Sequence, residues 1–220
     1  MNAEPDLLAE VERCRRHPAY LLDRVKCVDS TRGESFTFQL LNPKAPWYWQ
    51  RELLNAWIDN DAYIALKARQ IGITWLAAGY ALWTLLFVPG SRVLVVSITE
   101  FEAVKVVNRI WDMYKSLPAH LRNVKVVKPR GSRPNLQIEL EHPDGLVSTV
   151  LGLPSTPTAG HGETAALVIL DEFSRQEYAS STWKACLPTT QGGGRILVIS
   201  TGNGVSTEKL KQMLAKYTEK

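Results

Sequence analysis

Residues 63–75 have the sequence Tyr-Ile-Ala-Leu-Lys-Ala-Arg-Gln-Ile-Gly-Ile-Thr-Trp, and this stretch decides the fold. An apolar segment at 62–66, predicted to be a buried strand, runs into a short polar turn, and a long apolar helical pattern begins at Ile73. Backbone N–H groups at such a loop and helix N-terminus point into one concavity, which attracts phosphate. The stretch therefore predicts a phosphate-binding loop between a strand and a helix.

The loop departs from the usual Walker A pattern, G-x-x-x-x-G-K-[ST]. Aligned on Gly72 and Thr74, the first glycine position holds Lys67 and the lysine position holds Ile73, while Lys67 and Arg69 place two cations at its front. Taken alone, such a string also fits a basic turn before a core helix, so the rest of the chain must decide. The predicted nucleotide contacts of this loop are Lys67, Ala68, Arg69, Gln70, Ile71, Gly72, Ile73, Thr74 and Trp75.

Length and composition indicate a globular domain. The 220 residues are 45% apolar and 22% charged, which suits one full-sized core with a small N-terminal appendage. A net charge of +4 is compatible with an acidic partner such as nucleic acid, although many proteins without one are as basic. Three scattered cysteines indicate reduced thiols. The longest apolar run, 75–88, is too short to span a bilayer, so no membrane partner is expected.

A second site is predicted where the apolar segment 166–170 ends in Asp171 and Glu172. The carboxyl end of a buried strand is where open α/β sheets keep their ligand crevice. Two adjacent carboxylates repel each other, and a nucleotide site would explain them by a division of labour. Asp171 would hold Mg²⁺ together with Thr74, while Glu172 would polarise the attacking water. The alternative is a strand that merely ends in a charged turn.

A third strand, 195–199, is followed by Ser200, Thr201 and Asn203. We expect these three residues to enter the same crevice, where their side chains could contact the γ-phosphate or the water and couple hydrolysis to neighbouring elements. As a lone feature, this segment would be an ordinary turn.

Upstream of the phosphate loop, Tyr48 and Gln50 are candidates for adenine recognition. An aromatic ring can stack on the base, and an amide can pair with its donor and acceptor edge. The alternative is that the aromatic residues around 47–49 pack the N-terminal segment onto the domain.

Together, these patterns predict an α/β fold. The expected architecture is a three-layer P-loop NTPase with a mostly parallel central sheet, in which an additional strand gives a RecA-like ATPase core. Residues 1–45 would form a short helical segment packed on that core, and residues 46–220 would form the core itself. The other predicted helices cover 6–16, 19–25, 47–59, 73–87, 99–116 and 207–217, and the other strands cover 35–41, 92–98, 124–127, 136–141 and 146–151.

The three sites in this order resemble the N-terminal ATPase domain of a viral large terminase subunit, the motor that packages phage DNA into a capsid. The segments that carry the resemblance are 67–75, 160–173 and 199–204. Members of this family often shift the loop lysine to the front, as with Lys67. Arg69 resembles the arginine that many members place inside the loop. The segment 200–204 looks like their coupling motif, and 47–50 is similar to their adenine motif.

The resemblance implies the following function. Lys67, Arg69 and Glu172 would be catalytic, ATP and Mg²⁺ would be the cofactors, and double-stranded DNA would be the translocated polymer. The portal and the small terminase subunit would be partners in the cytoplasm of the host cell. The assembled form would be a homo-oligomeric ring, with a monomer as the alternative for the isolated chain.

The sequence departs from the family pattern at two points. Many relatives have an arginine in the loop before the acidic strand that can reach a neighbouring subunit, whereas this loop has His161; Arg130 and Arg133 are the other candidates for such a trans contact. Full-length members continue into a nuclease domain, for which this chain has no room. We therefore expect a truncated form or a split subunit without DNA cleavage. The alternative functions are a helicase-like or remodelling ATPase and a non-catalytic, nucleotide-gated assembly module.

Overall fold

The computed structural model describes residues 3–29, 33–127 and 137–202. The predicted helix at 207–217 and three predicted site residues lie outside this part of the chain: Asn203, Arg130 and Arg133.

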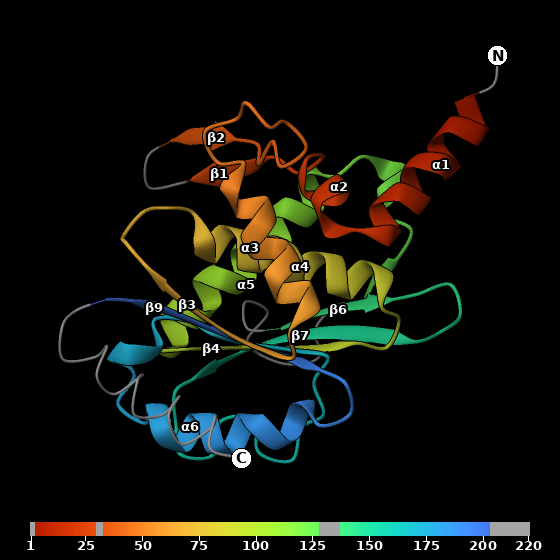
Figure 1. The fold of residues 1–220 in the computed structure, drawn as a ribbon. Helices are drawn as coiled ribbons and strands as arrows, with labels where there is room; N and C mark the ends of the chain where they lie inside the picture. Colours follow the sequence, from red (N-terminus) through yellow and green to blue (C-terminus); the bar gives the residue numbers. More distant parts are fainter. Residues whose placement is uncertain (1–2, 30–32, 128–136, 203–220) are drawn as a thin grey trace.

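A seven-stranded sheet forms the centre of the described molecule, with the order β3-β9-β8-β4-β7-β6-β5 (Figure 1). The first five strands in this order are parallel, and β6 and β5 extend the sheet antiparallel. The bounds are β3 Ala62–Lys67, β4 Arg92–Ser97, β5 Lys125–Val127, β6 Gln137–Glu141, β7 Val147–Pro154, β8 Leu167–Leu170 and β9 Arg195–Thr201. The hairpin expected around 142–145 is present as β6 and β7.

The position of β9 sets the relation between the predicted sites. This strand lies between β3, which leads into the phosphate loop, and β8, which ends just before Asp171. The predicted additional-strand arrangement is thus confirmed, and all three sites lie at the carboxyl ends of adjacent parallel strands. The apolar runs of β8 and β9 are buried, as expected for central parallel strands. The expectation of a buried β3 is wrong: β3 is at the sheet edge, and Leu66 on it is 50% exposed.

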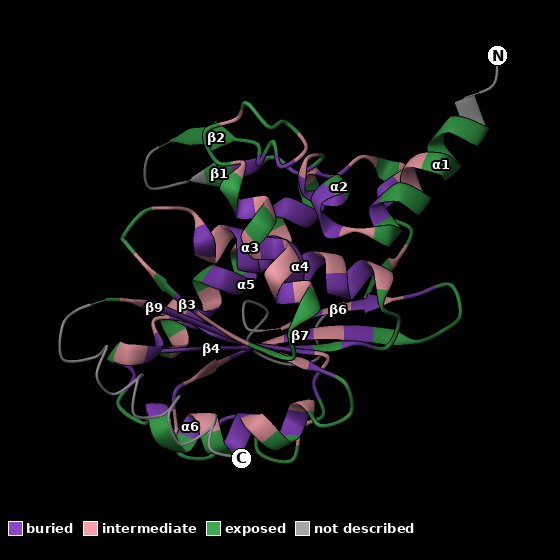
Figure 2. Ribbon diagram, in the orientation of Figure 1, coloured by how far each residue is buried: buried purple, intermediate pink, exposed green. Residues whose placement is uncertain are grey.

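Helices cover both faces of the sheet (Figure 1). The helices α3, α4 and α5 lie on one face and α6 on the other, which gives the three predicted layers. Figure 2 shows that α4 is buried along most of its length, because it packs against α2, α3 and α5 as well as the sheet. The bounds are α1 Ala3–Arg16, α2 Pro18–Leu22, α3 Trp49–Asp59, α4 Ile73–Phe87, α5 Glu100–Ser116 and α6 Ala179–Cys186. Helix α6 was not predicted from the sequence.

The N-terminal segment contains a ribbon as well as helices. The strands β1 Cys27–Asp29 and β2 Glu34–Phe36 pair antiparallel, and they replace the longer single strand expected at 35–41. Leu22 of α2 is fully buried in the same hydrophobic cluster as the apolar residues of α4. Whether the chain divides between residues 45 and 46 stays a prediction. Within the described residues, no helix is long and apolar enough to cross a membrane.

Candidate functional site

The predicted phosphate loop joins β3 to α4 through two left-handed backbone conformations. Gln70 has φ = 63°, and Gly72, the N-cap residue of α4, has φ = 77°. A left-handed residue immediately before a helix is suited to glycine. A Cβ at Gly72 would also lie 2.8 Å from Nε2 of Gln50, so a larger residue would displace the Gln50 amide. The first turn of α4 therefore starts from a tightly specified bend, with its N–H groups directed into the loop.

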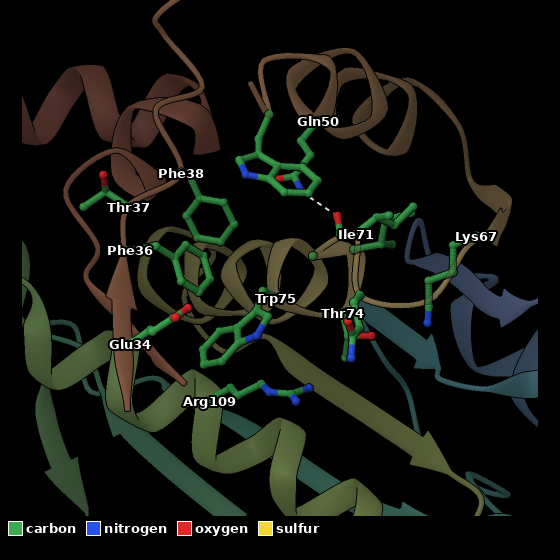
Figure 3. Close-up of a pocket in the computed structure, with 14 residues that line it drawn as sticks. Glu34, Phe36, Thr37, Phe38, Gln50, Lys67, Ile71, Thr74, Trp75 and Arg109 are labelled. Carbon is green, nitrogen blue, oxygen red and sulfur yellow. Dashed lines mark hydrogen bonds between the residues drawn. The ribbon is translucent and has the colours of Figure 1, made fainter. Parts of the chain in front are cut away.

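Gln50 holds this loop directly. The side chain is buried, and Nε2 donates a 3.0 Å hydrogen bond to the carbonyl oxygen of Ile71 (Figure 3). The amide has a second N–H and an acceptor oxygen, which remain chemically suited to a purine edge. Tyr48 does not line the adjacent pocket, whereas Trp47 does. If an aromatic residue of this segment contacts a base, the structure favours Trp47 over the predicted Tyr48.

Asp171 and Thr74 meet across the crevice. The Thr74 hydroxyl donates a 3.2 Å hydrogen bond to Oδ1 of Asp171. Burial raises the pKa of the Asp171 carboxyl and the charge of Glu172 adds to the rise, while the charges of Lys67 and Arg109 and the Thr74 hydrogen bond oppose it. No group of three His, Cys, Asp or Glu side chains in the described ranges could hold a metal alone. A hydroxyl beside a carboxylate fits Mg²⁺ when phosphate oxygens and water complete the coordination.

Glu172 is held by one residue from each of two neighbouring strands, β3 and β9. Nζ of Lys67 lies 2.9 Å from its Oε1, and the Thr201 hydroxyl lies 3.0 Å from both carboxylate oxygens. The parallel register pairs Lys67 with Thr201 and so aligns the two partners. Burial raises the pKa of Glu172, but the hydrogen bonds from Lys67 and Thr201 and the Lys67 charge outweigh it and lower the pKa overall. The carboxylate is therefore ionised at neutral pH.

The remaining predicted residues take different positions. Ser200 is buried, and its hydroxyl accepts a 3.1 Å hydrogen bond from the backbone N–H of Ser174. Its side chain therefore stabilises the turn after β8 and not the Glu172 carboxylate. This follows from the alternation of side chains along a strand, which sends Ser200 and Thr201 to opposite faces. Arg69 and His161 are both exposed, and neither lines the pocket beside the loop.

A pocket of about 490 Å³ extends from the phosphate loop toward the N-terminal ribbon (Figure 3). Its walls combine loop residues with side chains that the sequence analysis did not select as site residues: Glu34, Phe36, Thr37, Phe38, Trp47 and Arg109. The aromatic residues of 36–38 gave a signal that could have been used, since alternating aromatics next to a ribbon are suited to lining an apolar cavity. No local pattern distinguishes Arg109 from the other charged residues of α5.

No protein-family model and no curated protein matches this chain. Among solved structures, the large terminase ATPase domain of Thermus phage P74-26 is 26% identical, with a TM-score of 0.54 over 65% of this chain and 60% of that chain. The large terminase of bacteriophage HK97 is 21% identical, with a TM-score of 0.58 over 84% of this chain and 37% of that one. The large terminase of the thermophilic bacteriophage D6E, in complex with ADP, is 14% identical, with a TM-score of 0.51 over 74% and 37%.

This chain thus spans 60% of the length of the P74-26 domain and 37% of the two longer proteins. The predicted resemblance and the predicted fold class are both confirmed by these matches. Strand order and structural neighbours agree that the chain has the fold of the ATPase domain of phage large terminases.

Proposed function

We propose that this chain is the ATPase motor domain of a viral DNA-packaging terminase, which hydrolyses ATP with Mg²⁺ to drive double-stranded DNA into a capsid. The observation that carries the proposal is the convergence at one crevice of Lys67, Thr74, Asp171 and Glu172 from three separate elements. The D6E large terminase, which shares the fold, has been solved with ADP, which supports nucleotide binding by this fold.

In this proposal the loop N–H groups and the N-terminus of α4 bind the phosphates of ATP. Thr74 and Asp171 would hold Mg²⁺, which neutralises phosphate charge when bound. The ionised carboxylate of Glu172 orients a water for in-line attack and accepts its proton. Lys67 pairs with Glu172 in the structure, so an incoming phosphate competes for this cation and leaves Glu172 available to the water.

Thr201 is the proposed link from hydrolysis to movement. Its hydroxyl contacts Glu172, and the neighbouring Ser200 holds the backbone of Ser174, so β9 is connected to the acidic turn on both of its faces. Loss of the γ-phosphate would alter these contacts and shift the end of β9. Asn203 stays a predicted member of this coupling segment. Arg69, exposed at the loop, is proposed to supply a further cation to the phosphates.

The wider assembly is also part of the proposal. DNA, the portal and the small terminase subunit would be the partners of a homo-oligomeric ring in the host cytoplasm, and this chain would not cleave DNA. A trans contact from His161, Arg130 or Arg133 would then complete the site of a neighbour. The second candidate is a nucleotide-gated module without catalysis, which is favoured by Ile73 at the usual lysine position and by the Lys67–Glu172 pair.

Replacement of Glu172 tests the catalytic assignment. In Glu172→Gln, ATP binding measured by calorimetry is expected to stay within about threefold of the parent, because the amide keeps the size of the side chain. Phosphate release, with and without DNA, is expected to fall by about 100-fold or more, the contribution typical of a general base. Glu177→Gln removes a nearby exposed carboxylate and should leave both quantities unchanged.

Two results would contradict the proposal. If Glu172→Gln hydrolyses ATP at the parent rate, Glu172 is not the base. If the parent binds ATP but releases no phosphate even at high protein concentration with DNA, the non-catalytic module is the better description.

A further inference from the structure

Arg109 brings to the pocket a positive charge from helix α5, which belongs neither to the predicted phosphate loop nor to the turn after β8. It lies on α5, whose apolar side is buried against the sheet through residues such as Val106 and Ile110. From there its side chain lines the pocket next to Thr74 and Trp75. Figure 3 shows the guanidinium end turned toward Thr74, with Lys67 on the other side of that residue. The pocket therefore has a cation on each side of the first turn of α4.

An aromatic contact fixes the position of Arg109. Its guanidinium carbon lies 4.8 Å from the ring centroid of Trp75, which is a cation–π distance. Trp75 is itself held by Phe36, whose ring meets it edge-on with centroids 5.5 Å apart. The N–H donors of a guanidinium lie in its plane and form a fork that matches a phosphate. The ring contact thus holds in the pocket a group with the geometry that polyphosphate recognition requires.

We propose that Arg109 binds the α- and β-phosphates of the nucleotide; this role rests on the proposed function. Lys67, which pairs with Glu172, marks the end of the pocket where the γ-phosphate would be cleaved. Phe36 and Phe38 mark the opposite, aromatic end, and Figure 3 shows Arg109 below Trp75, with its guanidinium end pointing toward Thr74. Arg109 then contacts the phosphates that ATP and ADP have in common, and it strengthens the binding of both to a similar degree.

Nucleotide titrations of the full chain test this role. For Arg109→Gln, the Kd values of ATP and ADP are expected to rise by similar factors of about 10 to 100, as for the loss of charge-assisted hydrogen bonds. Adenosine, titrated at millimolar concentration by NMR, should bind as it does to the parent. The matched control is Lys105→Gln, which removes one positive charge from the same helix at an exposed position paired with Glu102. Arg109→Lys keeps the positive charge but loses the planar fork of donors. Its Kd values for ATP and ADP should lie between those of Arg109→Gln and Lys105→Gln.

The outcomes separate this inference from the proposed function. If the parent binds ATP and ADP and Arg109→Gln binds both as tightly, the inference fails and the proposed function stands. If Arg109→Gln weakens adenosine as much as ADP, Arg109 supports only the shape of the pocket, and the inference also fails. A parent chain that binds neither nucleotide overturns the proposed function and the inference together.

Discussion

Gly72 satisfies two demands at a single position. Its φ of 77° is a conformation that residues with a side chain adopt only at a cost, and a Cβ there would meet Gln50 at 2.8 Å. Gln50 in turn bonds to the carbonyl of Ile71, so the clash would be transmitted to the loop. A side chain at position 72 would therefore strain the backbone and disturb the hydrogen bond from Gln50 to Ile71.

We predict that Gly72→Ala weakens nucleotide binding as well as stability. Gly162→Ala is the matched control, because Gly162 has the same φ of 77° and a Cβ there would meet no atom within 4 Å. Both variants should lose about 1–2 kcal/mol of unfolding free energy from the left-handed backbone, and Gly72→Ala should lose more. Only Gly72→Ala should raise the Kd of ATP. Urea denaturation and calorimetry measure the two effects, and equal losses in both variants would contradict the assigned role of Gln50.

At this scale, the sequence predicted the residues that local patterns define. Lys67, Thr74, Asp171 and Glu172 come together as expected, because each lies at the end of a strand or the start of a helix whose type is evident in the sequence. Arg109 could not be predicted. It lies on a helix whose exposed side carries several charged residues, and only the packing of α5 beside α4 decides which of them reaches the pocket.

Among the elements, α2 depends on a titratable cap. Nδ1 of His17 accepts the N–H of Ala19 at 3.1 Å, so Nε2 carries the proton and donates to Oδ1 of Asn55 at 2.9 Å. Burial lowers the pKa of His17 from its ordinary value, despite the opposing effect of the Asn55 hydrogen bond. The short helix is therefore best capped while His17 is neutral.

We predict that this cap fails in mild acid. The folded pKa of His17 lies below its unfolded value of about 6.5, so the unfolded state takes up the proton more readily. The associated stability is present above the unfolded pKa and is lost as the pH falls through the folded one. The melting temperature of the parent should therefore drop more between pH 7.5 and 5.5 than that of His17→Asn, which keeps a capping acceptor that does not titrate. Parallel pH dependence in both proteins would rule out this role.

Sequence patterns predicted the bounds of some elements but not the direction of every side chain. The helices α4 and α5 begin and end within a residue of their predicted bounds, because α4 is a continuous apolar run, α5 is amphipathic and Thr99 caps α5 as expected. Ser200 and Thr201 illustrate the opposite case. Their sequence indicates polar residues at a strand end, but the face that each occupies depends on the register of β9 against its neighbours.

For the molecule as a whole, the N-terminal segment shares its core with the sheet-covering helices. Leu22 is fully buried, and its side chain lies so close to Gly79 that a Cβ there would be 2.8 Å from Cδ2. Such a contact between α2 and α4 leaves no solvent layer between the segment and the core. The segment and the core should therefore unfold together.

We predict that Leu22→Ala destabilises the entire chain by about 2–5 kcal/mol, as for a core leucine. Urea denaturation should show a single transition, followed both by circular dichroism and by tryptophan fluorescence. Leu8→Ala, at a position that is 68% exposed, should change the stability by less than about 0.5 kcal/mol. An independent early transition in Leu22→Ala would indicate a separately folding segment.

The general architecture could be predicted from the sequence, but the lateral position of β3 could not. Its apolar residues suggested burial, whereas β9 alone pairs with it and its other side forms the edge of the described sheet. Strand order depends on long-range pairing, which leaves no trace in the local pattern of any single strand. For the same reason, the ribbon that lines the pocket with Phe36 became apparent only in three dimensions.

Two of the three described non-glycine residues with positive φ, Gln70 and Glu172, lie on the two loops that face each other across the crevice, together with Gly72. Such backbone is unfavourable in isolation, so the surrounding sheet and helices must hold it in place. An arriving nucleotide consequently meets loops that are already bent, and little of its affinity is lost to ordering them. Preorganisation of this kind makes the rigidity of distant packing a determinant of how tightly the crevice binds.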